Sequence, residues 1–242
     1  MPLDASPLDV AALAWFLIVW LGYGRVSDRV TGRAVGLNHH MVTLREVWMR
    51  RMLQRDNRIM DSQLIGHTVH SVTFFASTTM LVLAGLVGVF GGVDRVYEVV
   101  GALSFTVQTS KQFFEAKMLL VIGIFVYGFF KFTWSLRQFN YLCALIGSAP
   151  LNPVPPEQVE TTARTTAMML TEAMSSSNAG MRSYYFAFAA IAWFIQPWLF
   201  IVATTWMLAV LVTRQVRSRS FMAIIDHLRQ HAAPGARPPE EG

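Results

Sequence analysis

The chain has 242 residues, of which 53% are hydrophobic and only 14% are charged. A soluble domain carries about 25% charged residues, so this composition excludes a protein whose whole surface faces water and favours one that faces lipid. The net charge is +5, but the arginines flank apolar segments, as membrane orientation requires, and we expect no nucleic acid as a partner. The single cysteine, Cys143, excludes a disulfide bond within the chain and a cysteine-based metal site.

Four segments are apolar enough to cross a bilayer, which requires about 20 residues. They cover residues 8–24, 67–90, 118–138 and 184–212. The sequence therefore predicts an all-α fold: a polytopic membrane helix bundle with about four transmembrane helices and amphipathic interfacial helices, in a membrane domain of residues 1–213.

A basic cytoplasmic loop is predicted over residues 25–66, between the first two spans. Apolar and basic residues recur at helical spacing in its second half, which predicts an amphipathic helix along the membrane surface. Its side chains Arg45, Arg50 and Arg51 are then expected to bind anionic lipid headgroups.

A helical loop is predicted over residues 151–180, because apolar residues recur on one side of a helix after a proline-rich turn. Residues 178–180, with the sequence Asn-Ala-Gly, are expected to end this helix.

The last span, 184–212, is longer than the bilayer core, so it must tilt, kink or protrude. Pro197 lies at its middle and is the expected kink. Residues 214–242 are predicted to form an amphipathic helix and a disordered tail.

Basic residues determine the expected orientation. The first loop holds eight arginines, so we place the first and third loops in the cytoplasm and the N-terminus outside, in the inner membrane of a bacterial cell. Four spans then put the C-terminus outside as well, which conflicts with the arginines that follow residue 213. A hairpin at Pro197 would remove the conflict; the eight-arginine loop favours four spans.

Two segments carry a family resemblance. Residues 56–88 read DNRIMDSQLIGHTVHSVTFFASTTMLVLAGLVG, and residues 139–150 read FNYLCALIGSAP. With FFASTTM and LIGSAP as the distinctive phrases, the chain resembles the domain-of-unknown-function family numbered 599, a family of multi-pass membrane proteins from bacteria and plants. The resemblance implies a membrane location and about four spans over most of the chain, and it implies no activity or catalytic residues.

The second span carries more polar side chains than a membrane anchor needs, and lipid cannot satisfy them. One interpretation is a polar path for a solute, proton or ion. The other is interfacial histidines with hydroxyl groups that bond back to their own helix. The candidate path consists of Gln63, His67, His70, Ser77, Thr78, Lys131 and Gln196.

Lys131 has two interpretations, because it lies well inside the third apolar segment. If the span ends there, its ammonium group extends to the headgroups at little cost. If the helix continues, Lys131 faces a bundle interior or pore and favours an anion or an anionic headgroup.

Ala84, Gly88 and Gly92 form a ridge of small residues at four-residue spacing. Such a ridge lets another helix approach closely. It indicates helix packing within the chain or in a homo-oligomer.

Three functions remain open. The chain is a pore or transporter for small solutes or ions, or a non-catalytic membrane subunit or scaffold of a larger complex, or a redox protein that binds haem through its histidines. No enzyme motif occurs, so we expect no catalytic residues, no cofactor and no metal; the expected partners are the lipid bilayer and copies or subunits in the membrane.

Overall fold

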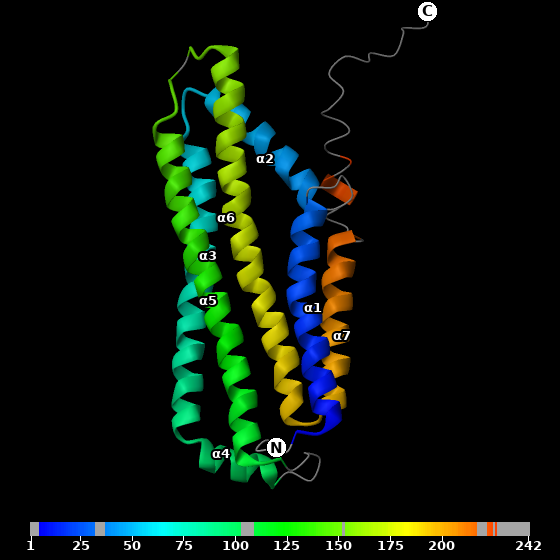
Figure 1. Cartoon of the computed structure of the whole chain (residues 1–242). Helices are drawn as coiled ribbons and strands as arrows, with labels where there is room; N and C mark the ends of the chain where they lie inside the picture. Colours follow the sequence, from blue (N-terminus) through cyan, green and yellow to red (C-terminus); the bar gives the residue numbers. More distant parts are fainter. Residues whose placement is uncertain are drawn as a thin grey trace, which may run out of the picture.

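The computed structural model describes residues 5–31, 37–102, 109–151, 153–216, 222–224 and 226. Every regular element in these ranges is helical, which confirms the predicted all-α class. The elements form a bundle (Figure 1) and are α1 (Pro7–Thr31), α2 (Leu37–Leu53), α3 (Ile59–Gly91), α4 (Val93–Gly101), α5 (Lys111–Gly147), α6 (Pro156–Ile191), the 3-10 turn η1 (Ala192–Phe194) and α7 (Pro197–Val216).

Four of these helices are long and apolar enough to cross a membrane: α1, α3, α5 and α7. Much of the surface of these helices is apolar and exposed within the single chain, as for Phe74, Leu81 and Phe130. Lipid is the solvent that tolerates such a surface. The prediction of a polytopic membrane bundle is therefore confirmed, and most of the segment 214–242 lies outside the described residues.

The predicted single span 184–212 and the predicted helix end at residues 178–180 are both wrong. α6 runs without interruption through residues 178–180, and the chain then reverses over Ala192–Phe194 before α7 begins at Pro197. Proline suits the first turn of a helix, where its missing N–H is not needed. Pro197 therefore starts a new antiparallel helix and does not kink an existing one.

α6 lies between α5 on one side and α1 with α7 on the other, while α3 packs on α5 (Figure 1). Five helices run along the bundle axis: α1, α3, α5, α6 and α7. α2 and the α5–α6 connection lie in the upper half of Figure 1, and α1 and α7 end below the upper tips of α5 and α6. The short helix α4 and the reversal at η1 lie at the lower end.

Two glycines allow α5 and α6 to approach closely. A Cβ atom on Gly180 would lie 2.8 Å from the ring of Phe132, and one on Gly128 would lie 2.2 Å from the Oγ atom of Ser183. Both distances are shorter than van der Waals contact, so only glycine fits at these two positions. Farther along the same pair of helices, the Oγ atom of Ser135 on α5 donates to the backbone oxygen of Ala173 on α6 at 2.7 Å.

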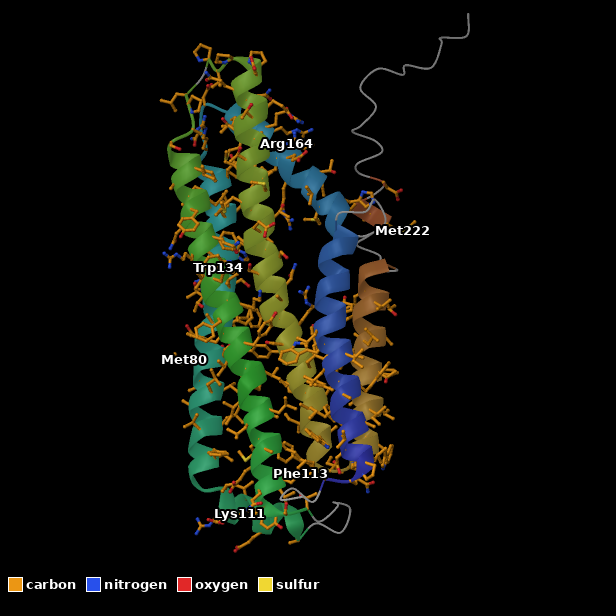
Figure 2. The ribbon with its side chains drawn as sticks, in the orientation of Figure 1. Met80, Lys111, Phe113, Trp134, Arg164 and Met222 are labelled. Carbon is orange, nitrogen blue, oxygen red and sulfur yellow. The ribbon has the colours of Figure 1, made fainter. Side chains whose placement is uncertain are left out.

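α3, α5 and α6 have 33, 37 and 36 residues and are longer than the hydrocarbon layer of a bilayer requires. Lys131 follows Lys111 by 20 residues, which is about 30 Å along an α-helix and matches the hydrocarbon thickness of a bilayer. Figure 2 shows Lys111 at the lower end, Trp134 farther up α5 and Arg164 near the upper end. We call α2 with residues 59–73, 132–147 and 156–181 the upper part, and the rest the membrane part.

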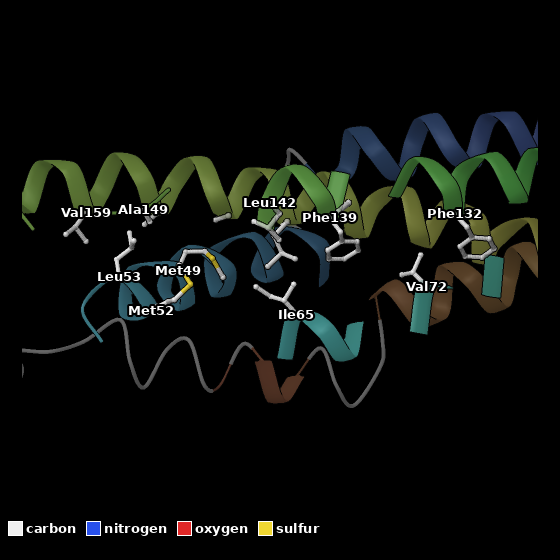
Figure 3. Close-up of a cluster of buried hydrophobic side chains, with 14 of the residues drawn as sticks. Met49, Met52, Leu53, Ile65, Val72, Phe132, Phe139, Leu142, Ala149 and Val159 are labelled. Carbon is white, nitrogen blue, oxygen red and sulfur yellow. The ribbon is translucent and has the colours of Figure 1, made fainter. Parts of the chain in front are cut away.

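Each part has its own apolar core. In the upper part, Met49, Met52 and Leu53 of α2 pack against Phe139 and Leu142 of α5 (Figure 3). In the membrane part, a second cluster joins α1, α5, α6 and α7 and includes Phe16, Phe125, Phe186 and Phe200.

We predict that Gly180→Ala destabilises the protein by about 1–3 kcal/mol, because the added methyl group overpacks the buried ring of Phe132. Gly123→Ala is the matched control: Gly123 lies in the same pair of helices, on α5, and its Cβ would meet nothing within 4 Å. The control should be neutral or slightly stabilising. Unfolding free energies measured in detergent check this, and equal values for both variants would contradict the α5–α6 contact.

Candidate functional site

A polar cavity of about 480 Å³ lies between α1, α5 and α6. α6 presents its cavity residues at spacings of three and four, as one face of a continuous helix does. The lining residues are Trp20, Leu21 and Gly24 of α1, Tyr127, Lys131, Trp134 and Gln138 of α5, and Glu172, Ser175, Ser176, Ala179 and Arg182 of α6.

Three charged groups line the cavity: the cations Lys131 and Arg182 and the carboxylate Glu172. The Nζ atom of Lys131 lies 5.5 Å from the ring centroid of Tyr127. The guanidinium carbon of Arg182 lies 5.9 Å from the ring centroid of Tyr23. Cations are attracted to aromatic faces, so these rings hold the two side chains near the cavity. The excess of positive charge favours an anionic ligand.

A hydrogen bond fixes the inner wall of the cavity. The Oγ atom of Ser176 on α6 donates to the Oε1 atom of the buried Gln138 on α5 at 2.7 Å. Because Ser176 donates to the Oε1 atom, the side-chain amide of Gln138 is held in one orientation.

Aromatic residues place the cavity at the boundary between lipid and headgroups. Trp20 and Tyr127 form an edge-to-face pair with centroids 5.4 Å apart, and Trp134 is half exposed. Tryptophan and tyrosine favour this depth of a membrane. An outer groove shares Tyr127, Lys131 and Trp134 with the cavity and continues to Arg137. Lys131 therefore lies between an inner cavity and an open groove.

The structure does not bring the predicted polar path together within one chain. Gln63, His67, His70 and Ser77 lie exposed on α3, on the far side of α5 from α1. Thr78 donates back to the backbone oxygen of Phe74 at 2.8 Å. Gln196 lies in the reversal at the lower end. Of the predicted residues, Lys131 alone lines the polar cavity.

The arginines of α2 also contact the chain itself. Arg50 makes a two-pronged pair with Glu160 of α6 at 2.8 and 2.9 Å, and this bond lowers the pKa of the Glu160 carboxyl. The half-buried Arg45 donates to the Oγ1 atom of Thr171 at 3.2 Å. Arg51 is exposed, so of the three predicted headgroup ligands it is the one whose side chain faces outward.

Arg182, Glu172 and Gln138 were not predicted as site residues. Their signal is present in the sequence: Glu172, Ser175, Ala179 and Arg182 share one helical face. The predicted helix end at residues 178–180 hid it, because Gly180 serves close packing and not helix termination.

A second group of buried charges closes the lower end of the bundle. The indole Nε1 of Trp193 donates to Asp9 at 2.7 Å, and the Nζ atom of Lys117 donates to the backbone oxygen of Trp193 at 3.1 Å. Ser6 donates to the other Asp9 oxygen at 2.6 Å. These bonds connect α1, α5 and η1, so we assign this group to the reversal between α6 and α7 and not to a ligand.

Comparison with known proteins gives one family model, described as "Protein of unknown function, DUF599", which matches residues 11–220. Neither the curated proteins nor the solved structures contain a significant match.

We predict that Trp193→Phe lowers the free energy of unfolding by about 1–3 kcal/mol, because a buried carboxylate oxygen of Asp9 loses its donor. Trp198→Phe is the control, since Trp198 is half exposed in the first turn of α7. Unfolding monitored by circular dichroism in detergent measures both. Equal losses would show that the Asp9 bond does not stabilise the reversal.

Proposed function

The chain belongs to the DUF599 family, and we propose that it is a multi-pass membrane protein that binds an amphiphile with an anionic headgroup in the cavity between α1, α5 and α6. One observation carries the proposal: Lys131 and Arg182 line a polar cavity together with Trp20 and Tyr127, residue types that favour the depth of lipid headgroups. A phosphate group is the chemistry that fits best, because guanidinium and ammonium groups bind it through charge-assisted hydrogen bonds.

The surroundings of the cavity support a ligand that enters from the side. Leu21 and the aromatic rings provide apolar surface next to the charges, which suits a molecule with a polar head and an apolar body. The shared wall with the outer groove gives such a ligand a route past Lys131. Glu172 offers an acceptor for an ammonium or hydroxyl group on the same headgroup.

The structure favours binding over an open pore. Below the cavity, the space between α1, α5, α6 and α7 is filled by the membrane-part core with Phe16, Phe125 and Phe186. A continuous path for a solute would require these helices to separate. We therefore propose transport only as uptake of the amphiphile from one leaflet of the bilayer. The proposed role involves no chemical step.

The distribution of charge supports an orientation with the upper end in the cytoplasm. α2, with Arg45, Arg50 and Arg51, and the end of α7, with Arg214, lie towards the same end of the bundle (Figure 1). The lower end carries Asp9, Asp94 and Glu98 among its charges. Five crossings put Arg214 on the same side of the membrane as the arginines of α2, in agreement with the positive-inside rule. We place the protein in a bacterial inner membrane with its N-terminus outside.

The binding proposal predicts that Lys131→Gln and Arg182→Gln each weaken binding of a short-chain phosphatidic acid about tenfold, because each variant removes a charge-assisted hydrogen bond. Glu172→Gln should leave binding unchanged or tighten it. Trp20 and Trp134 line the cavity, so quenching of tryptophan fluorescence in detergent reports occupancy. Lys111→Gln, at the other end of α5, is the control. Equal binding of phosphatidylcholine and phosphatidic acid would argue against the proposal.

The orientation proposal predicts that green fluorescent protein fused after residue 242 is fluorescent in a bacterial host, because it stays in the cytoplasm. Alkaline phosphatase fused before residue 1 should be active, because it reaches the periplasm. A dark C-terminal fusion with an intact membrane-inserted protein would reject five crossings in this orientation.

A further inference from the structure

The charged groups of the polar cavity are separated along its length. α5 and α6 run antiparallel (Figure 1), and the ring of Phe132 packs against Gly180, so Lys131 lies close to the level of Gly180 and Arg182. Glu172 precedes Arg182 by 10 residues, which is about 15 Å toward the upper end along an α-helix. All three charged residues line the same cavity. The cavity therefore has a cationic end toward the membrane part and an anionic end toward the upper part.

The anionic end of the cavity offers hydrogen-bond acceptors to a ligand. Glu172 is exposed, and it belongs to none of the salt bridges among the described residues. Residues 168–176 of α6 contain no Lys or Arg. Ser175 lines the cavity beside Glu172, and a serine hydroxyl oxygen accepts hydrogen bonds as well. A ligand group that reaches this end meets a full negative charge and a neutral acceptor.

The order of these charges matches the order of groups in a membrane phospholipid. The apolar chains of such a molecule lie in the hydrocarbon layer, which surrounds the membrane part below the cavity. Lys131 and Arg182 are the charged groups of the cavity nearest to that layer, and they meet the phosphate in the proposed function. Glu172 lies farther from the hydrocarbon and so faces the group attached to the phosphate. The long side chains of Lys131 and Arg182 let the phosphate lie nearer to Glu172 than the backbone spacing alone suggests.

A primary ammonium group is the chemistry that fits Glu172 best. It carries the charge opposite to the carboxylate and several N–H donors, so it forms an ion pair and additional hydrogen bonds. A hydroxyl group donates a single hydrogen bond and carries no charge. A quaternary ammonium group has no N–H donor and binds aromatic faces instead. The rings of Tyr127 and Tyr23 already hold the two cations at the other end of the cavity.

We propose that the cavity selects a phospholipid with a primary ammonium group beyond its phosphate, as in an ethanolamine headgroup. The phosphate, which is the anionic group of the proposed function, lies at Lys131 and Arg182, and the ammonium group donates to Glu172 and Ser175. This inference rests on the phosphate binding proposed above and adds the contact by which one phospholipid is distinguished from another. Binding is non-covalent, and the headgroup leaves unchanged.

Comparison of two phospholipids that differ only at the ammonium group tests the inference. Short-chain phosphatidylethanolamine and phosphatidylcholine have the same phosphate and the same net charge, but only the first has N–H donors. Quenching of tryptophan fluorescence in detergent should show that the wild type binds phosphatidylethanolamine about threefold more tightly, as expected of an exposed ion pair. Glu172→Ala should remove this preference, because it removes both the charge and the acceptor. The same variant should bind phosphatidic acid as well as the wild type does, or more tightly.

Glu157→Ala is the matched control, because Glu157 is also an exposed glutamate of α6 and does not line the cavity. It should keep the preference of the wild type. Equal binding of the two lipids by the wild type, or a preference that survives in Glu172→Ala, would overturn the inference; the proposed function stands if Lys131→Gln still weakens binding of phosphatidic acid. Tighter binding of phosphatidylcholine would place the headgroup against the aromatic rings and overturn the inference as well. If Lys131→Gln leaves binding of phosphatidic acid unchanged, the phosphate site is wrong and both proposals fall.

Discussion

The close approach of α5 and α6 determines where the other helices lie. α6 carries Arg182 at the start of its membrane part, where lipid alone would not tolerate a charge, so other helices must surround it. Gly128 and Gly180 bring its backbone against α5, and the hydrogen bonds from Ser135 to Ala173 and from Ser176 to Gln138 fix the register. α3 then covers one side of α5, and α1 with α7 covers the remaining side of α6.

Tyr184 connects the two parts of the molecule. Its ring packs against both apolar cores, and its hydroxyl group lies 2.9 Å from the buried Oγ1 atom of Thr79 on α3. The aromatic contacts with Phe75, Phe125 and Phe132 surround it at the level where the membrane part ends. Movement of α6 along its axis would disturb this group, so Tyr184 holds α6 in register with α3 and α5.

The sequence predicted the class of fold because apolar composition and segment length depend on the solvent and not on the neighbours. Of the candidate path residues, it named Lys131, which lines the polar cavity; the packing role of Ala84, Gly88 and Gly92 stays a prediction. It did not predict the last two helices, since Gly180 and Pro197 each have two uses. Glycine ends a helix or admits a neighbour, and proline kinks a helix or starts one; which use applies depends on Phe132 and on the reversal held by Trp193. The cavity was missed with them, because Arg182 belongs to the same helix as Glu172 only if α6 is continuous.

The polarity of α6 has a consequence for the synthesis of the protein. Although α6 is long enough, its sequence, unlike those of α1, α3, α5 and α7, is too polar to count as an independent span. A segment of this kind is poorly recognised as it leaves the translocon, and its polar side chains find partners on neighbouring helices, as Ser176 does on α5 and Tyr185 on α7. α6 must therefore enter the bilayer together with α7, as a hairpin that docks on helices already inserted. Truncation before residue 197 would remove more than one helix from the membrane, because it would leave α6 without the partner that carries it in.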